Sequence, residues 1–157
     1  MPTPPIPHRY RHYRVEPLRF FDVPQVARLE RIVFPEPMHL GQIQRKYLAR
    51  WRTRYLAVKD GRRLIAYFGF EVFDHYAHVL ANVTHPDYRR QGLAAFVLTA
   101  AKPWALQLGA KAFLGEVRRS NDAQLAVLQS IGWQQLTLIP GFFGNGEDAY
   151  LVMKVFD

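Results

Sequence analysis

The stretch from His85 to Ala95, HPDYRRQGLAA, places positive charge and bare backbone directly before an apolar run. Two adjacent arginines, Arg89 and Arg90, precede Gly92. The first N–H groups of a helix lack internal partners, and the helix dipole makes that end attractive to anions. A glycine there lets an anion approach the backbone closely. The sequence therefore predicts a phosphate or pyrophosphate bound by the main chain of residues 90–95.

Taken alone, this segment leaves a second interpretation open, in which Gly92 eases a turn and the arginines are solvated. Other phosphate loops fit less well, since the chain contains no G-x-x-x-x-G-K-[ST] and no G-x-G-x-x-G. With no cysteine, disulfides, thiolate ligands and a catalytic thiol are excluded. His75 and His78 are three positions apart in an expected strand and face opposite sides, so no metal site is expected.

The composition is that of one globular domain. The chain has 157 residues, 49% hydrophobic and 22% charged. No apolar run approaches the roughly 18 residues of a membrane span, and the first residues lack the apolar core of a signal peptide. A cytoplasmic location is expected. The net charge of +8 favours polyanionic partners. Residues 1–13 form a basic arm, either simply solvated or a handle for RNA or a ribosomal target.

Hydrophobic periodicity predicts alternating strands and helices, hence a mixed α/β domain over residues 14–157. Strands are expected over 14–20, 55–59, 63–73, 75–84, 112–117, 133–139 and 148–156. Helices are expected over 22–33, 39–51, 93–108 and 121–131.

Local signals set several of these boundaries. Asp22 and Gln25 suggest a capping box, and Asp60-Gly61 suggests a hairpin. Asn121 is expected to cap the last helix. Pro103 is expected to kink the helix over 93–108.

Five segments together resemble the GNAT acetyltransferases, over about residues 12–155. Arg89–Ala94 is similar to the family's acetyl-CoA pyrophosphate loop, Gln/Arg-x-x-Gly-x-Gly/Ala, and Asn82–Pro86 to the end of its central strand. The segments EVRRSN (116–121), SIGW (130–133) and GEDAY (146–150) are similar to the RimI-type branch, which acetylates ribosomal-protein N-termini.

The resemblance implies a single-domain GNAT fold, a mixed and mostly antiparallel central sheet of about seven strands flanked by about four helices. It implies acetyl-CoA as the acetyl donor and direct transfer to an amine in a ternary complex. The strand before the loop would pair its main chain with the pantetheine arm. The implied cofactor-binding residues are Asn82, Val83, Thr84, Arg89, Arg90, Gln91, Gly92, Leu93, Ala94, Ala95 and Asn121.

Glu116 is the candidate catalytic base, because it ends a buried strand, where a poorly hydrated carboxylate accepts a proton more readily. Its counterpart in RimI-type enzymes is the proposed base. The alternative is that Glu116 pairs with Arg118 or Arg119. An α-amino group has a pKa of ~7.7–8.0 and lysine ~10.4, so an N-terminus is easier to deprotonate by about 3–4 kcal/mol.

The chain departs from the family at Leu128, where the usual general acid is a tyrosine. A thiol pKa of ~8.5 lets the thiolate leave near neutral pH with little help, and a lost acid costs about 10²–10⁴-fold at most. Ser130, Tyr150 or a water stay open as replacements.

By the same resemblance, substrate contacts are expected from Phe34, Glu36, Phe142 and Phe143, although these aromatics would also plug an open end of the domain. The predicted function is acetylation of a protein N-terminus, ribosomal in the family, with small first residues favoured. The alternatives are a lysine or small-molecule amine as acceptor, or an acetyl-CoA-binding module without turnover. The expected partners are acetyl-CoA and a protein or peptide N-terminus, with ribosome contact through the basic surface and no membrane.

Overall fold

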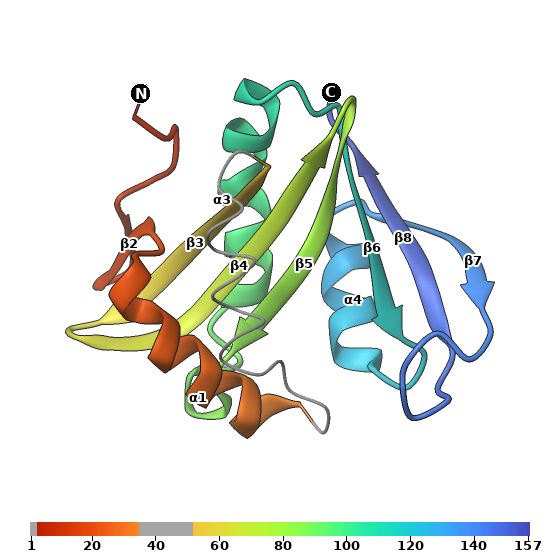
Figure 1. Ribbon diagram of the computed structural model, residues 1–157, viewed down its shortest axis with the longest axis horizontal. Coiled ribbons are helices and arrows are strands. Elements are labelled where there is room, and N and C mark those ends of the chain that lie inside the picture. The colour runs from red at the N-terminus through yellow and green to blue at the C-terminus, as the bar shows by residue number, and fades with distance from the viewer. Residues whose placement is uncertain (1–2, 35–51) are drawn as a thin grey trace.

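A computed structural model describes residues 3–34 and 52–157 of the chain. Eight strands form one sheet in the order β1-β2-β3-β4-β5-β6-β8-β7, with helices on both faces (Figure 1). The strands are β1 (Arg9–Tyr10), β2 (Tyr13–Pro17), β3 (Thr53–Asp60), β4 (Arg63–Phe73), β5 (Tyr76–Thr84), β6 (Ala112–Arg118), β7 (Gln134–Ile139) and β8 (Ala149–Val155). The helices are α1 (Val23–Val33), α3 (Leu93–Gln107) and α4 (Asp122–Ser130), with 3-10 turns η1 (Phe20–Asp22) and η2 (Pro86–Tyr88).

The mixed α/β fold expected from the sequence is confirmed. The sheet has one strand more than the seven expected, because residues of the basic arm form β1 and pair with β2. Ile6 and Tyr13 are buried in the core on the α3 face. The helix expected over 39–51 lies outside the described residues.

One pair of strands breaks the antiparallel pattern of the sheet. β5 and β6 run parallel and are paired only at Ala77↔Phe113 and His78↔Leu114. Beyond these pairs the two strands diverge, as the ribbon shows (Figure 1). The sheet is therefore opened between β5 and β6, with β1–β5 on one side of the opening and β6–β8 on the other.

The two faces of the sheet carry separate cores. Tyr67 of β4 packs in the core beneath α1, and the next residue, Phe68, packs in the core beneath α3. This alternation follows from the two-residue period of a strand. Helix α3 adds Trp104, whose ring meets Phe70 edge-on at 5.9 Å. Together the two cores fix β4 and β5 rigidly beside the opening.

The start of α1 differs from the expected capping box. Asp22 makes no side-chain cap bond to α1. Its carboxylate instead accepts the Arg19 N–H at 2.8 Å and pairs with Lys59 Nζ at 2.8 Å. Gln25 accepts the Leu64 N–H at 3.0 Å, which ties α1 to β4. The buried ammonium of Lys59 needs a carboxylate partner, and this tertiary demand outweighs the local cap.

Phe34, Gly61 and Gly109 act at their boundaries as expected, whereas the strand over 14–20 is shorter than expected. Phe34, the residue before Pro35, is extended and ends α1. Gly61 turns β3 into β4 with φ +59°. Gly109, with φ +95°, follows the end of α3, and α3 runs through Pro103 as one helix. The expected strand over 14–20 stops at Pro17, because Phe20 enters η1. Among the described residues, no helix is both long and apolar enough to cross a bilayer.

Candidate active site

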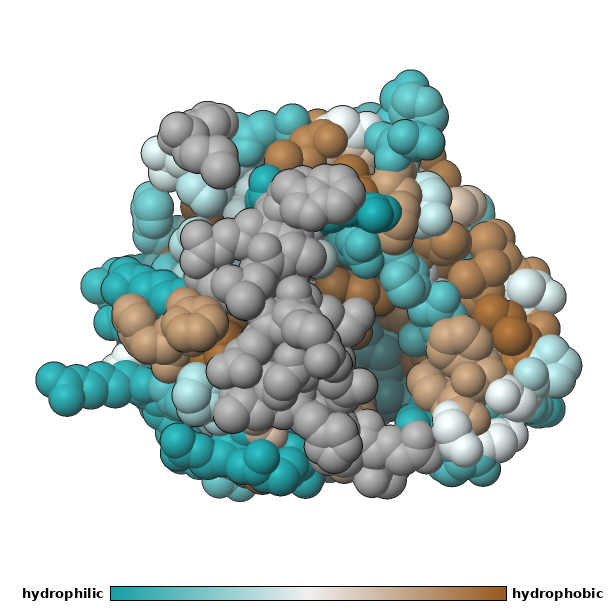
Figure 2. All heavy atoms as spheres, in the orientation of Figure 1, coloured by the Kyte–Doolittle hydropathy of each residue, from teal (hydrophilic) through white to brown (hydrophobic). Residues whose placement is uncertain are grey.

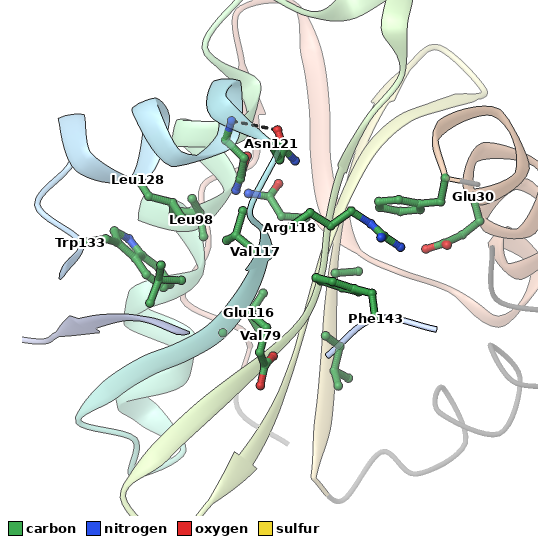
Figure 3. A pocket seen from close by; sticks show the side chains of 17 residues that line it. Glu30, Val79, Leu98, Glu116, Val117, Arg118, Asn121, Leu128, Trp133 and Phe143 are labelled. Carbon is green, nitrogen blue, oxygen red and sulfur yellow. Dashed lines mark hydrogen bonds between the residues drawn. The ribbon is translucent and has the colours of Figure 1, made fainter. Parts of the chain in front are cut away.

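A cavity of about 330 Å³ lies where β5 and β6 diverge. Leu98 of α3 and Leu128 of α4 line it from one face of the sheet, and Glu30 and Phe34 from the α1 face. Figure 3 shows Leu98 and Leu128 on one side of β6 and Glu30 on the other, and Figure 2 shows the surface hollowed in this region. Residues from both faces of the sheet thus border one cavity, so an acetyl donor and an amine acceptor can meet there from opposite sides.

Glu116 of β6 lies in the wall of this cavity. Its carboxylate oxygens are 2.8 and 3.1 Å from Nε2 of His78 on β5. His78 belongs to the last pair that joins β5 to β6, so its ring is fixed where the strands part. A neutral imidazole that bonds a carboxylate through Nε2 carries its proton there. The carboxylate is thereby oriented and keeps lone pairs for a further proton.

The alternative partners expected for Glu116 are wrong. Arg118 Nη1 lies 3.3 Å from Glu147, and Arg119 Nη1 lies 3.2 Å from Asp148. The Ser120 hydroxyl and N–H, with Arg118, lower the pKa of Glu147. The two arginines therefore join the end of β6 to the segment before β8, and Glu116 pairs with His78 instead.

The segment over residues 89–95 has the geometry expected of an anion site. Helix α3 begins at Leu93, after Gly92 in the left-handed conformation with φ +79°. The Phe96 N–H bonds to the Gly92 carbonyl at 2.9 Å. The N–H groups of residues 93–95 therefore have no partner within the helix. Arg89 and Arg90 are exposed beside them.

Asn121 caps α4 as expected. Its Oδ1 accepts the Gln124 N–H at 3.2 Å, and the residue also borders the cavity. Capping and a contact to a ligand in the cavity are therefore compatible. On β5, Asn82 borders the cavity, whereas Val83 and Thr84 do not.

The side chain of Asn82 carries the plainest sign of a polar ligand. Its Oδ1 and Nδ2 are both buried, and neither has a hydrogen-bond partner among the described residues. A buried polar group left unpaired costs about 1–3 kcal/mol. The thioester and amides of an acetyl-pantetheine arm offer both a donor and acceptors. The residues of the cavity therefore fit the acetyl donor that the sequence implies.

Leu128 is 3% exposed and borders the cavity without any polar atom. The two side chains considered as replacement acids lie elsewhere. The Ser130 hydroxyl donates to the Val127 carbonyl at 2.6 Å, and neither Ser130 nor Tyr150 borders the cavity. Among the described residues, Asn82 Nδ2 is a side-chain donor in the cavity that lacks a partner.

Of the residues expected to contact the acceptor substrate, some line the cavity and one does not. Phe34 and Phe143 line the cavity. Phe142 does not, and it is 46% exposed, with its ring edge-on to Phe143 at 5.0 Å. The Arg118 guanidinium lies 4.0 Å from the centre of the Phe143 ring and holds this wall in place. Glu36 lies outside the described residues.

One acidic residue of the cavity, Glu30, was not predicted from the sequence. Glu30 of α1 is 3% exposed and lines the α1 side (Figure 3). Its carboxylate accepts the hydroxyl of Tyr67. Burial and the negative charge of Glu30 hold the pKa of Tyr67 well above its usual range. The available signal was the place of Glu30 one turn after Val26, on the apolar face of α1.

Comparison with known proteins identifies the class. The model of the acetyltransferase (GNAT) family matches residues 20–133. The chain therefore belongs to the GNAT family and is an acyltransferase, with acetyl-CoA as its acetyl donor.

The individual relatives resemble this chain at low sequence identity. The chain is 31% identical over 78 residues to an N-alpha-acetyltransferase of Saccharolobus solfataricus, a match that spans 49% of this chain and 47% of that protein. It is 28% identical to the N-alpha-acetyltransferase RimI of Mycobacterium tuberculosis, over 85% of this chain and 86% of that protein. The fold is similar to the crystal structure of the ribosomal-protein-S18-alanine N-acetyltransferase of Escherichia coli. That likeness has a TM-score of 0.81 at 21% identity and covers 92% of this chain and 94% of the other.

Proposed function

We propose that this protein acetylates the α-amino group of a protein or peptide N-terminus, with Glu116 as the general base. The observation that carries the proposal is the carboxylate of Glu116, held by His78 in the wall of a cavity reached from both faces of the sheet. The similarity of this chain to proteins named N-alpha-acetyltransferase supports an N-terminal amine as the acceptor.

In this proposal, acetyl-CoA lies on the α3 and α4 face. The N–H groups of residues 93–95 and the charges of Arg89 and Arg90 bind its diphosphate. The edge of β5 from Asn82 to Thr84 and the side chain of Asn121 bind its pantetheine arm. When bound, the donor supplies an activated thioester carbonyl.

The remaining chemistry belongs to the residues of the cavity. Glu116 accepts the proton that the amine loses, directly or through one water, as the new N–C bond forms and the C–S bond breaks. An α-amino group needs about 3–4 kcal/mol less than lysine to reach the neutral state, so one carboxylate base suffices. Asn82 Nδ2 lies in the same cavity and donates a hydrogen bond to the thioester group, a role that Leu128 cannot fill.

The acceptor peptide enters on the α1 face, between Phe34 and Phe143. These rings form an apolar wall suited to a small first residue, with Glu36 and Phe142 as further expected contacts. Contact with the ribosome agrees with the net charge of +8, because ribosomal RNA is a polyanion. Binding to such a target through the basic arm, residues 1–13, would weaken as salt rises.

The test is release of CoA from acetyl-CoA with two peptides. One has a free Ala or Ser N-terminus and no lysine, and the other has a blocked N-terminus and one internal lysine. Turnover of the first peptide only, reduced about 10²-fold or more by Glu116→Gln, is the expected result. Turnover of the second peptide alone would reassign the acceptor to a side-chain amine. Binding of acetyl-CoA with no turnover of either would make the protein a cofactor-binding module.

A further inference from the structure

Two tyrosines of the N-terminal hairpin hold the segment at residues 89–95, about 80 positions away in the chain. The Tyr10 hydroxyl donates to the backbone carbonyl of Gln91 at 2.6 Å. The Tyr13 hydroxyl donates to Oε1 of the same residue at 2.7 Å. One glutamine is thus fixed at both its main chain and its side chain.

Both tyrosines are themselves held firmly. The Tyr10 ring stacks on Phe96 of α3, with ring centres 4.3 Å apart. Tyr13 is 4% exposed, and its ring meets Tyr88 edge-on at 5.8 Å. Their hydroxyls are therefore fixed relative to the start of α3, and the hydrogen bonds to Gln91 cost little further ordering.

The bond from Tyr10 determines which way the next N–H group points. In a planar trans peptide, the C=O of one residue and the N–H of the next point in opposite directions. Since the Gln91 carbonyl is directed at Tyr10, the Gly92 N–H is directed away from it. The Gly92 N–H thus lies beside the N–H groups of residues 93–95 at the N-terminal end of α3, where an anion is favoured.

The backbone of this segment needs such support. Arg90 has φ +63° and Gly92 has φ +79°, and a non-glycine residue at positive φ costs about 1–2 kcal/mol. A Cβ at Gly92 would lie 2.8 Å from the Tyr10 hydroxyl oxygen. A side chain at position 92 would therefore displace the Tyr10 hydroxyl, in addition to straining the backbone.

We propose that Tyr10 and Tyr13 are positioning residues that hold the backbone of residues 89–95 in the shape that binds the diphosphate of acetyl-CoA. The inference rests on the proposed function, which places the diphosphate at this segment. Loss of one hydroxyl removes one hydrogen bond, so each Tyr→Phe variant weakens acetyl-CoA binding about 3–10-fold. The double variant weakens it by at least 10-fold.

The test compares three acetyl donors by calorimetry. S-acetylpantetheine lacks the diphosphate, acetyl-dephospho-CoA retains it without the 3′-phosphate, and acetyl-CoA carries both. The variants are Tyr10→Phe, Tyr13→Phe and the double variant. The matched control is Tyr76→Phe. The Tyr76 ring stacks on Phe73, with ring centres 5.5 Å apart, and this pair is remote from residues 89–95. The Tyr76 hydroxyl has no hydrogen bond among the described residues.

The expected result is weaker binding of acetyl-CoA and acetyl-dephospho-CoA in the double variant, with S-acetylpantetheine unchanged and Tyr76→Phe like wild type. Equal losses for all three donors would overturn the proposal, since the tyrosines would then support the whole fold. Full affinity of the double variant for acetyl-CoA would also overturn the role of the two tyrosines, but it would not contradict a diphosphate site at residues 89–95. If wild type bound S-acetylpantetheine as tightly as acetyl-CoA, the diphosphate site of the proposed function would itself fail, together with this inference.

Discussion

Nε2 of His78 lies 2.8 Å from Oε2 of Glu116, across the point where β5 and β6 part. The contact follows from strand register. His78 is paired with Leu114, and Glu116 lies two residues further along β6, on the same face as Leu114. The Glu116 carboxylate thus borders the cavity from the first position on that face beyond the paired part of the two strands.

We predict that His78→Leu lowers kcat by up to about 10²-fold, because a carboxylate freed from its donor loses its orientation toward the amine. His78→Gln keeps an N–H donor and should retain more of the rate. The KM for acetyl-CoA should change little in both variants. The measurement is steady-state kinetics with the lysine-free peptide. A wild-type kcat in His78→Leu would show that Glu116 needs no support from this ring.

For Asn82→Leu we predict opposite effects on stability and activity. The change removes two buried polar atoms that lack partners and keeps a side chain of similar size. The free energy of unfolding should rise by about 1–3 kcal/mol, while turnover falls because a donor to the thioester is lost. Such a trade-off is typical of a residue kept for function.

A matched control is Tyr55→Phe, since the Tyr55 hydroxyl is also buried without a partner but does not border the cavity. It should raise stability and leave turnover unchanged. Thermal unfolding and CoA release on both variants make the comparison. Full activity in Asn82→Leu would remove Asn82 from the site.

The sequence predicted those parts of the fold that depend on neighbours along the chain. The helix over 93–107 was visible in its apolar spacing, and the cap at Asn121 in one residue type at one position. The anion site proposed at residues 89–95 can be predicted because its charge, its glycine and the start of the helix are contiguous. The motif that contains Glu116 predicts it as the base, and that role stays a prediction.

The residues that support this site could not be predicted, because their partners are remote in the sequence. The His78–Glu116 contact depends on a parallel register that no local pattern encodes. Tyr10 meets Gln91 only after β1 and β2 join the sheet. Asp22 looked like a helix cap, and its tertiary partner Lys59 overrode that local preference.

A buried charge cluster under the N-terminal part of the sheet should make stability depend on pH. Lys59 Nζ is 2.7 Å from Glu16 and 2.8 Å from Asp22. Burial alone would raise the pKa of Glu16, but the hydrogen bond and charge of Lys59, with Arg14 and Arg19, hold it below its usual 4.5. A carboxyl with a lowered folded-state pKa stabilises the fold above its unfolded-state pKa, and this contribution is lost as the pH falls through the folded-state value.

We therefore predict that unfolding free energy falls as pH drops below about 4.5, and that Glu16→Gln makes this decline shallower. The variant should also be less stable than wild type at neutral pH. Urea unfolding at a series of pH values measures both effects. Parallel curves for variant and wild type would place the acid sensitivity in other groups.

Gly92→Ala tests the close approach of Tyr10 through a double-mutant cycle. In the wild-type background the new Cβ meets the Tyr10 hydroxyl, which is 2.8 Å away, and the residue is also strained at φ +79°. We predict a larger loss of stability here than in the Tyr10→Phe background, where only the backbone strain of about 1–2 kcal/mol remains. The difference between the two backgrounds is the coupling free energy, expected at about 0.5–3 kcal/mol for residues in contact. Equal losses in both backgrounds would mean that the hydroxyl moves aside at no cost, and that backbone conformation alone requires glycine at position 92.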